Sequence, residues 1–248
     1  MRAVLTALLL AAGWQAYAQL GGIDEFILPA PSEIATALYQ DRALLWHNFT
    51  VTASEVLLGI VVAVAAGLAC AVAIHLSMTV RRTAYPLLVA SQTVPVVIIA
   101  PLLVAWWGFE LTPKLAIVGL VCFFPVTVTT LDGLGRVDGD LRKLMRTLDA
   151  SRFQVLRRVE APGALPAVFS GARIAVAVAV IGAVLAEQAG SSEGLGHLIT
   201  QAIPQFATAR AYAAVVILSI FAIVLFGLLT LAERRLLPWA HQPTGDMP

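Results

Sequence analysis

The chain has 248 residues, of which 59% are hydrophobic and only 12% are charged. A soluble protein of this length would lack the polar side chains needed to cover its surface, so the composition excludes a soluble globular domain and indicates an integral membrane protein. The formal net charge of +1 says little about partners, because the positions of the charges relative to the apolar segments matter more than their sum.

Six apolar runs each approach the ~20 residues that a helix needs to cross the hydrocarbon layer of a membrane. They comprise residues 3–20, 56–76, 86–107, 115–131, 167–186 and 212–232. The two cysteines lie in separate runs, where a thiol behaves as a small apolar group, and we expect no disulfide. The sequence therefore predicts an all-α integral membrane protein with about six transmembrane helices.

The basic residues between the runs predict how the chain is oriented. If both termini lie in the cytoplasm, almost all arginine and lysine residues fall on the cytoplasmic side, including those of the long loop over residues 132–166. Only Arg42, Lys114 and Arg210 fall outside. The opposite orientation would reverse this bias, so the positive-inside rule places the long basic loop in the cytoplasm.

The first run, within residues 1–22, has two interpretations. It is the first transmembrane helix, or it is a secretory signal, because a short apolar core after Arg2 ends in Ala16-Tyr17-Ala18, which imitates a cleavage site. Cleavage would leave the new N-terminus outside and the other five spans in the same orientation. The rest of the chain divides into an outer connector, a transmembrane core and a cytoplasmic tail, at residues 23–50, 51–239 and 240–248.

The cytoplasmic loop contains a short amphipathic helix. Leu141, Leu144, Met145 and Leu148 recur at spacings of three, four and seven, which places them on one face of a helix. Asp149 follows where the end of a helix requires a residue that tolerates left-handed backbone angles. We therefore expect a helix with an apolar face that needs a partner, although a solvated loop whose arginines only satisfy the positive-inside rule is the alternative.

A second short helix is expected directly after a turn at Asp149 and Ala150. Ser151 precedes Gln154 by three residues, the spacing of a capping box, so this helix would begin at Arg152. It would end near Val159, because the prolines at 162 and 166 discourage continuation. The product is a basic helix-turn-helix projection between two apolar spans.

This loop resembles the cytoplasmic "EAA" loop of the permease subunits of ABC importers, in which a Glu-Ala-Ala triplet precedes a glycine and the segment ends in Leu-Pro. Lys143-Leu144-Met145 stands at the triplet, Asp149 at the glycine and Ala161-Pro162 at Leu-Pro, so only the proline is strict. The surrounding residues resemble the sulfonate, nitrate, taurine and thiamine-precursor permeases. Gln92-Thr93-Val94-Pro95 and Cys122-Phe123-Phe124-Pro125 look most similar to permeases for thiamine-precursor pyrimidines.

The resemblance implies a type I ABC importer permease in a bacterial plasma membrane, working as a homodimer among membrane lipids. Two ATPase subunits would bind the loops and supply ATP-Mg, and a periplasmic or lipid-anchored protein would deliver a small solute. That solute would be a thiamine-precursor pyrimidine, with riboflavin or a sulfonate, nitrate or taurine-type anion as alternatives; no nucleic acid is involved. The implied ATPase-coupling residues are Leu141, Leu144, Met145, Leu148, Asp149, Ala150, Ser151, Arg152 and Pro162.

Three residues are candidates for the translocation pathway or its gate. Gln92 and Pro95 lie in the third run, where Pro95 and Pro101 remove backbone donors and should bend the helix. Glu187 lies near the outer end of the fifth run, where an acid is costly unless it is hydrogen-bonded or faces water. It also resembles the family's acid before a Gly-Leu-Gly turn. The alternative is a structural partner of Arg210.

Several motifs are absent from the sequence. It contains no G-x-x-x-x-G-K-[ST] phosphate loop, so ATP hydrolysis requires a separate subunit, and this chain is not expected to be an enzyme or to hold a cofactor. It has no H-E-x-x-H or Cys/His cluster and no G-x-S-x-G elbow, which argues against a metal site and a catalytic nucleophile. The alternatives of another class are a channel, which would need no ATPase, and an intramembrane enzyme.

Overall fold

The computed structural model describes residues 2–241, which form helices and no strands. The all-α prediction is therefore confirmed. The α-helices are α1 (Arg2–Leu20), α2 (Pro31–Gln40), α3 (Arg42–Leu76), α4 (Met78–Ser91), α5 (Val96–Trp107), α6 (Leu111–Arg136), α7 (Gly139–Thr147), α8 (Arg152–Val155), α9 (Ala161–Gly190), α10 (Leu195–Ala202) and α11 (Thr208–Leu236). A π-helical turn, Leu156–Glu160, joins α8 to α9, and a short 3-10 turn, Pro238–His241, follows α11. Most of the predicted tail, residues 242–248, lies outside the described residues.

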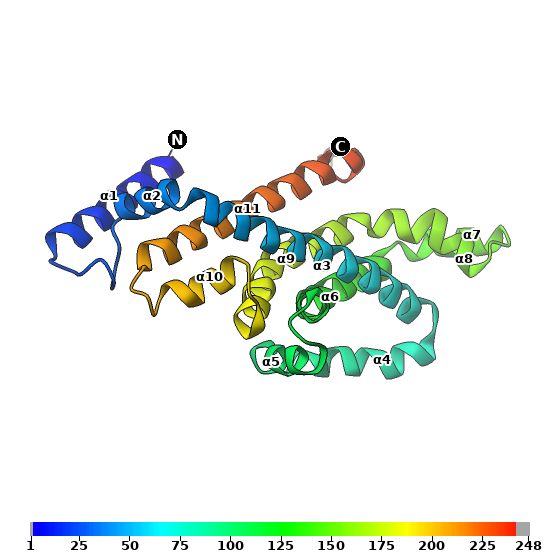
Figure 1. Ribbon diagram of the computed structural model, residues 1–248. Helices are drawn as coiled ribbons and strands as arrows, with labels where there is room; N and C mark the ends of the chain where they lie inside the picture. The colour runs from blue at the N-terminus through cyan, green and yellow to red at the C-terminus, as the bar shows by residue number, and fades with distance from the viewer. Residues whose placement is uncertain (1, 242–248) are drawn as a thin grey trace.

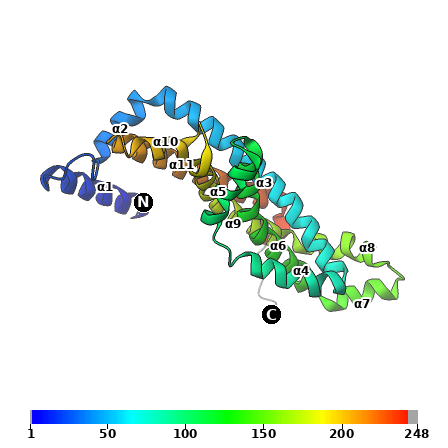
Figure 2. The same cartoon turned by 60° about the horizontal axis from the view of Figure 1, so that its bottom comes forward.

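Four helical segments in the described chain are long and apolar enough to cross a membrane, namely residues 42–76, 111–136, 152–190 and 208–236. The α4–α5 pair gives a fifth span if it is counted as one broken helix. The first predicted run folds as α1, which lies near α2 at one end of the elongated molecule, opposite α7 and α8 (Figures 1 and 2). The described residues thus carry four or five such spans, against about six expected.

Helices α3, α6 and α9 pack together at the centre of the molecule (Figure 1). Gly59 and Gly67 of α3 face Val118 and Val126 of α6 so closely that a Cβ atom on either glycine would overlap the valine side chain. Small residues let helix backbones approach in this way in membrane proteins, where van der Waals packing rather than water drives association. The α3–α6 contact therefore depends on glycine at both positions.

The third predicted run is broken, as its prolines predict, but more sharply than a kink. Helices α4 and α5 meet at 98°, and the break covers residues 92–95, from Gln92 to Pro95. Pro95 precedes the first residue of α5 and lacks the N–H that would continue α4. Helix α4 also begins at Met78, earlier than the apolar run. Many large apolar side chains of α4 and α5 are exposed in the single chain.

The second short helix of the loop does not end near Val159, so that prediction is wrong. It continues through the π turn into α9, and the combined helix has 39 residues. The N–H of Ala161 donates to the carbonyl oxygen of Leu156, five residues earlier, instead of the usual four. This wider turn shifts the hydrogen-bond register immediately before Pro162, whose missing N–H therefore does not end the helix.

Candidate functional site

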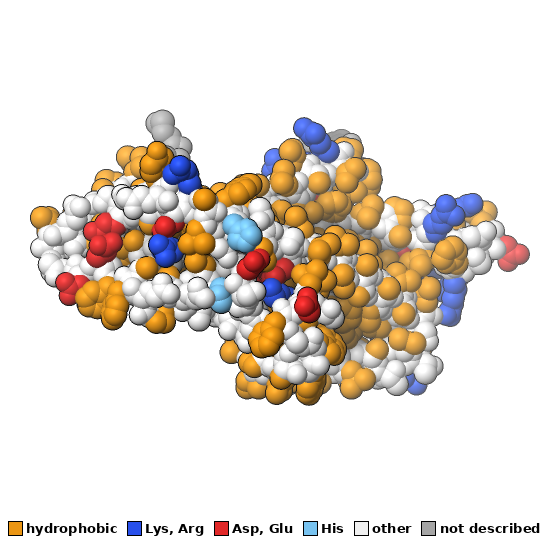
Figure 3. All heavy atoms as spheres, viewed as in Figure 1, with side chains coloured by type: hydrophobic (Ala, Val, Ile, Leu, Met, Phe, Trp, Pro, Cys, Tyr) orange, Lys and Arg blue, Asp and Glu red, His pale blue; other side chains and the backbone are white. Residues whose placement is uncertain are grey.

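Helix α7 projects from the membrane helices at one end of the molecule (Figures 1 and 2). It starts at Gly139 because the side chain of Asp138 caps it, accepting a hydrogen bond of 2.8 Å from the backbone N–H of Asp140. None of the residues of α7 is buried. Several basic side chains gather at this end of the molecule (Figure 3), so an apolar-faced helix stands in a basic, solvent-exposed surface.

The turn after α7 has the conformation that the sequence predicts. Asp149 has a φ of 59°, in the left-handed region. The N–H of Asp149 donates to the carbonyl oxygen of Arg146 at 3.0 Å, and the N–H of Ala150 donates to that of Met145, also at 3.0 Å. These two bonds form a Schellman motif, which satisfies the last carbonyl groups of the helix. The position normally favours glycine, and aspartate is among the few residues that tolerate it.

Helix α8 begins where its capping box predicts. The N–H of Gln154 donates to the Ser151 hydroxyl at 3.3 Å, and the side-chain oxygen of Gln154 accepts from the N–H of Ser151 at 2.7 Å. The Arg152 guanidinium donates to the carbonyl oxygen of Leu76, at the end of α3, at 3.3 Å. Pro162 lies in the first turn of α9. The loop is therefore ordered by local caps at both of its short helices.

Large apolar side chains of α7, of the residue that follows it and of α8 are exposed. Leu141, Leu144, Leu148 and Phe153 are between 47 and 69% exposed, and we call these four side chains the coupling face. Met145 belongs to the same side of α7 but is partly buried. Sequence reasoning missed Phe153, because it lies on the second short helix and is not part of the apolar spacing of α7.

At the opposite end of α9, Glu187 is enclosed rather than open. Its side chain is 1% exposed. Oε1 accepts a hydrogen bond of 2.6 Å from the Thr52 hydroxyl of α3, and Oε2 accepts one of 2.5 Å from the N–H of Gly196. The Thr52 hydroxyl in turn accepts from the N–H of Leu195 at 2.8 Å. The carboxylate therefore ties α9 to α3 and to the start of α10.

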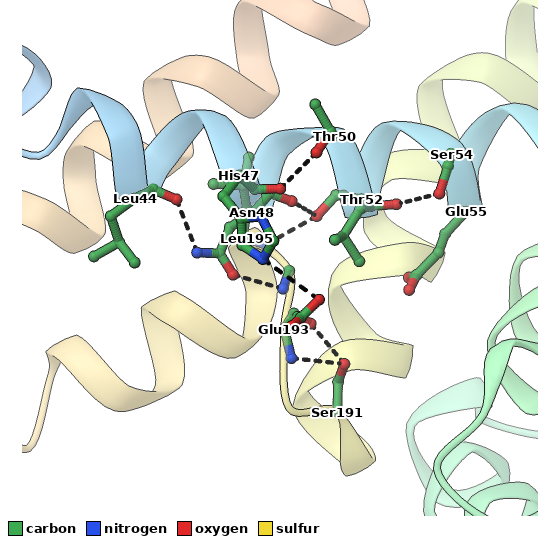
Figure 4. Close-up of polar contacts among 12 residues, drawn as sticks. Leu44, His47, Asn48, Thr50, Thr52, Ser54, Glu55, Ser191, Glu193 and Leu195 are labelled. Atoms are coloured by element: carbon green, nitrogen blue, oxygen red, sulfur yellow. Dashed lines mark hydrogen bonds and ion pairs between the residues drawn. The ribbon is translucent and has the colours of Figure 1, made fainter.

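The turn before α10 is held by the same face of α3. Asn48 and Thr52 point from α3 toward this turn (Figure 4), and the N–H of Gly194 donates to Asn48 Oδ1 at 2.7 Å. Gly194 has a φ of 112° and lies against Glu187, so a side chain would be both strained and obstructed here. Glycine at the start of the Gly-Leu-Gly sequence is thus required by backbone angle and by space.

A buried ion pair lies beside this turn. Lys114 Nζ, at the start of α6, is 2.7 Å from Glu55 Oε1 of α3 and donates to the Ser191 hydroxyl at 2.7 Å. Both charged residues are nearly inaccessible, at 7% and 1% exposure. Sequence reasoning placed Lys114 outside and did not assign it a role, because its partner is 59 residues away. This ion pair therefore joins an interior position of α3 to the start of α6 and to the end of α9.

The alternative interpretation of Glu187 as a partner of Arg210 is wrong. The Arg210 guanidinium binds Asp41 instead, with Nε at 2.7 Å and Nη2 at 3.1 Å from the two carboxylate oxygens. Gln92 and Pro95 lie at the exposed break between α4 and α5, apart from the enclosed carboxylate of Glu187. Among residues 2–241, no group of His, Cys, Asp and Glu side chains is arranged to hold a metal ion.

Residues 57–238 match the family described as "Binding-protein-dependent transport system inner membrane component". The formylaminopyrimidine transport permease protein ThiX of Halalkalibacterium halodurans is 34% identical, over 91% of this chain and 90% of that protein. The riboflavin transport system permease protein RibX of Chloroflexus aurantiacus is 35% identical, over 95% and 88%. A crystal structure of an amino acid ABC transporter has a similar fold, with a TM-score of 0.63 and 18% identity, and covers 81% of this chain.

Proposed function

Because the chain belongs to the family of binding-protein-dependent transport system inner membrane components, and is thus the permease subunit of an ABC importer for a small solute, we propose that its coupling face binds the partner ATPase. The permease is not itself an enzyme, and the ATPase is a separate subunit. One observation carries the proposal: α7 is capped at both ends, so it is an ordered helix, yet its leucines have no partner within the described chain. Burying one such side chain contributes roughly 1.5–3 kcal/mol.

The proposal includes the rest of the assembly. Two permease copies would contact each other through the exposed apolar side chains of α4 and α5, with Gln92, Pro95 and the enclosed Glu187 near the pathway or supporting its gate. The basic end with α7 would face the cytoplasm, both termini would lie inside, and a substrate-binding protein would dock at the opposite face. ATP-Mg bound by the ATPase would drive the change from inward-facing to outward-facing.

Docking at the coupling face is tested by Leu144→Glu and Leu148→Glu. Each places a carboxylate where an apolar contact is proposed, and an unpaired charge buried in the interface costs several kcal/mol. We expect both variants to reach the membrane in normal amounts and to lose the co-purifying ATPase. Lys143→Glu, on another side of the same helix, is the matched control and should retain it. Normal co-purification by the leucine variants would contradict the proposal.

For the solute, we propose a thiamine-precursor pyrimidine. The support is the local similarity around Gln92–Pro95 and Cys122–Pro125 and the relative named for formylaminopyrimidine transport. Riboflavin is one alternative solute, since a relative of similar sequence identity is named as a riboflavin transport permease. A sulfonate-type anion is the second alternative. Uptake of radiolabelled formylaminopyrimidine and riboflavin by vesicles containing the complete transporter separates them. Uptake without ATPase or ATP would instead indicate a channel.

A further inference from the structure

Helix α7 is tied to the membrane helices largely through one arginine. With no buried residue of its own, α7 has little packing to hold it against the body. The Arg142 guanidinium donates from Nη2 to the carbonyl oxygens of Gly135 and Val137, at the end of α6, at 2.9 and 2.5 Å. Its Nε lies 3.5 Å from Glu160 Oε1, in the π turn at the base of α9. Any displacement of α7 therefore acts on Arg142.

Glu160 connects this arginine to a third element. Its Oε2 lies 2.9 Å from Nε2 of His75, in the last turn of α3. Because an ionised carboxylate has no hydrogen to donate, His75 is the donor, whether the imidazole is neutral or charged. The side chain of Glu160 is only 7% exposed, so one nearly buried carboxylate joins α7, α3 and α9.

The surroundings of Glu160 supply basic partners and leave it room to move. A cavity of about 250 Å³ adjoins it, and Glu160 is the only acidic residue among the described residues that line this cavity, together with Arg142, Arg146, Arg152 and His75. The second and larger cavity, of about 610 Å³, lies beyond His75 and Arg142. The carboxylate is thus bound by charge and not enclosed by tight packing.

We propose that Glu160 is a positioning residue that transmits displacement of α7 to the transmembrane helices, an inference that rests on the proposed docking of the ATPase at α7. Helix α9 continues without interruption from Glu160 to Glu187, and α3 runs from Thr52 to His75. The two helices are joined again at the far end through Thr52 and Glu187. Movement of Arg142 shifts the base of both helices, and their length carries it, at 1.5 Å per residue, about 40 Å along α9 and about 35 Å along α3 to the outer turn.

The test uses the permease and its co-expressed ATPase together in nanodiscs. A spin label at Ser192→Cys, in an exposed turn and in a Cys70→Ala background, reports the distance between the outer ends of the two copies with and without ATP and vanadate. In Glu160→Gln, which keeps the size and loses the charge, we expect normal ATPase co-purification and at least about a 5-fold loss of the ATP-driven distance population. Lys143→Gln is the matched control, because the ion pair of Lys143 with Asp140 is largely exposed, and it should behave like the parent protein.

Arg142→Gln should reproduce the loss, and the double variant should be no worse than either single one, because both substitutions break one connection. If Glu160→Gln does not accumulate in the membrane, the distance response of Arg142→Gln tests the inference instead. The Arg142 side chain is partly exposed and lies outside the bundle, so this substitution should leave the fold intact. An unchanged distance response in Arg142→Gln or Glu160→Gln would overturn the inference while the docking stands. Absence of ATPase from the parent preparation would overturn the docking and, with it, this role.

Discussion

The two ends of the α3–α9 pair are joined in different ways. At the end that the proposed orientation places outside, Glu187 accepts hydrogen bonds from the Thr52 hydroxyl and the backbone N–H of Gly196, and the carboxylate is sealed from solvent. At the inner end, Glu160 contacts His75 and Arg142 and borders a cavity of about 250 Å³. The outer connection is made by neutral groups fixed in the backbone and packing, whereas the inner one involves a cation on a projecting helix. We infer that the connection made by Glu187 is a fixed joint, whereas the connection made by Glu160 can move.

If this comparison holds, substitutions at the outer end should mainly lower stability, and substitutions at the inner end should mainly affect communication with the ATPase. The largest effect is expected for Lys114→Met, which leaves the Glu55 carboxylate buried without its cation. Removing one partner of a buried ion pair typically costs about 3–5 kcal/mol. The melting temperature of the purified protein in detergent should fall sharply, and adding Glu55→Gln should recover part of the loss.

Lys143→Met is the control for that experiment. Lys143 forms an ion pair of the same 2.7 Å length with Asp140, but both side chains are about four-fifths exposed, at 78 and 83%. Exposed pairs contribute only about 0–1 kcal/mol, so its melting temperature should hardly change. Equal melting of the Lys114→Met and Lys143→Met variants would show that the outer end is not the fixed joint.

A smaller loss is expected when Glu187 is replaced by leucine. The substitution leaves the N–H of Gly196 without an acceptor, at about 1–3 kcal/mol for a buried unsatisfied group, whereas the Thr52 hydroxyl can still donate to the carbonyl of Asn48. Glu187→Gln should be milder, because the amide oxygen can accept from Gly196 and the amide nitrogen can donate to Thr52, whose own hydroxyl can bond the carbonyl of Asn48. Thermal melting compares the two variants. Transport lost in the glutamine variant at normal stability would instead assign the charge a role in the pathway.

The smallest change in stability is expected at the inner end. Asp149→Gly should be well tolerated, because glycine adopts the observed φ of 59° without a Cβ penalty. Asp149→Val should cost about 1–2 kcal/mol of local stability in the turn after α7, since a left-handed conformation is unfavourable for a residue with a side chain of this shape. We expect normal melting of the membrane helices in both variants and weaker ATPase co-purification only for valine. Equal behaviour of the two would mean that the turn is not important for docking.

Local signals in the sequence were sufficient for much of the loop between α6 and α9. The apolar spacing of α7, the capping box at Ser151 and the tolerance of Asp149 for a left-handed angle each depend on residues within about one or two turns, and all three features are present. The continuation past Pro162 was not predictable, because a π turn changes the hydrogen-bond register without a distinctive residue pattern.

Connections between distant segments could not be read from one sequence. The pairs His75–Glu160 and Thr52–Glu187 are separated by 85 and 135 residues, and nothing in either local sequence identifies the partner. The alternative pairing of Glu187 with Arg210 had the right charges and the right end of the molecule, but Arg210 binds an acid on another helix. Tertiary packing decides which polar groups meet, and it also decides the spacing of α3 and α6 at the glycines.

The π turn has a consequence for insertions and deletions. A π turn contains one more residue than the α-helical turn it replaces, so deleting one residue within 156–160 would let the segment relax into a regular helix. The remaining residues would complete the same turn as a regular α-helix, so α8 would keep its direction relative to α9, whereas a deletion of one residue in the regular part of the helix would rotate α8 by about 100°. The π turn is therefore a place at the base of the basic, apolar-faced projection where the chain can lose one residue without changing the direction of the projection.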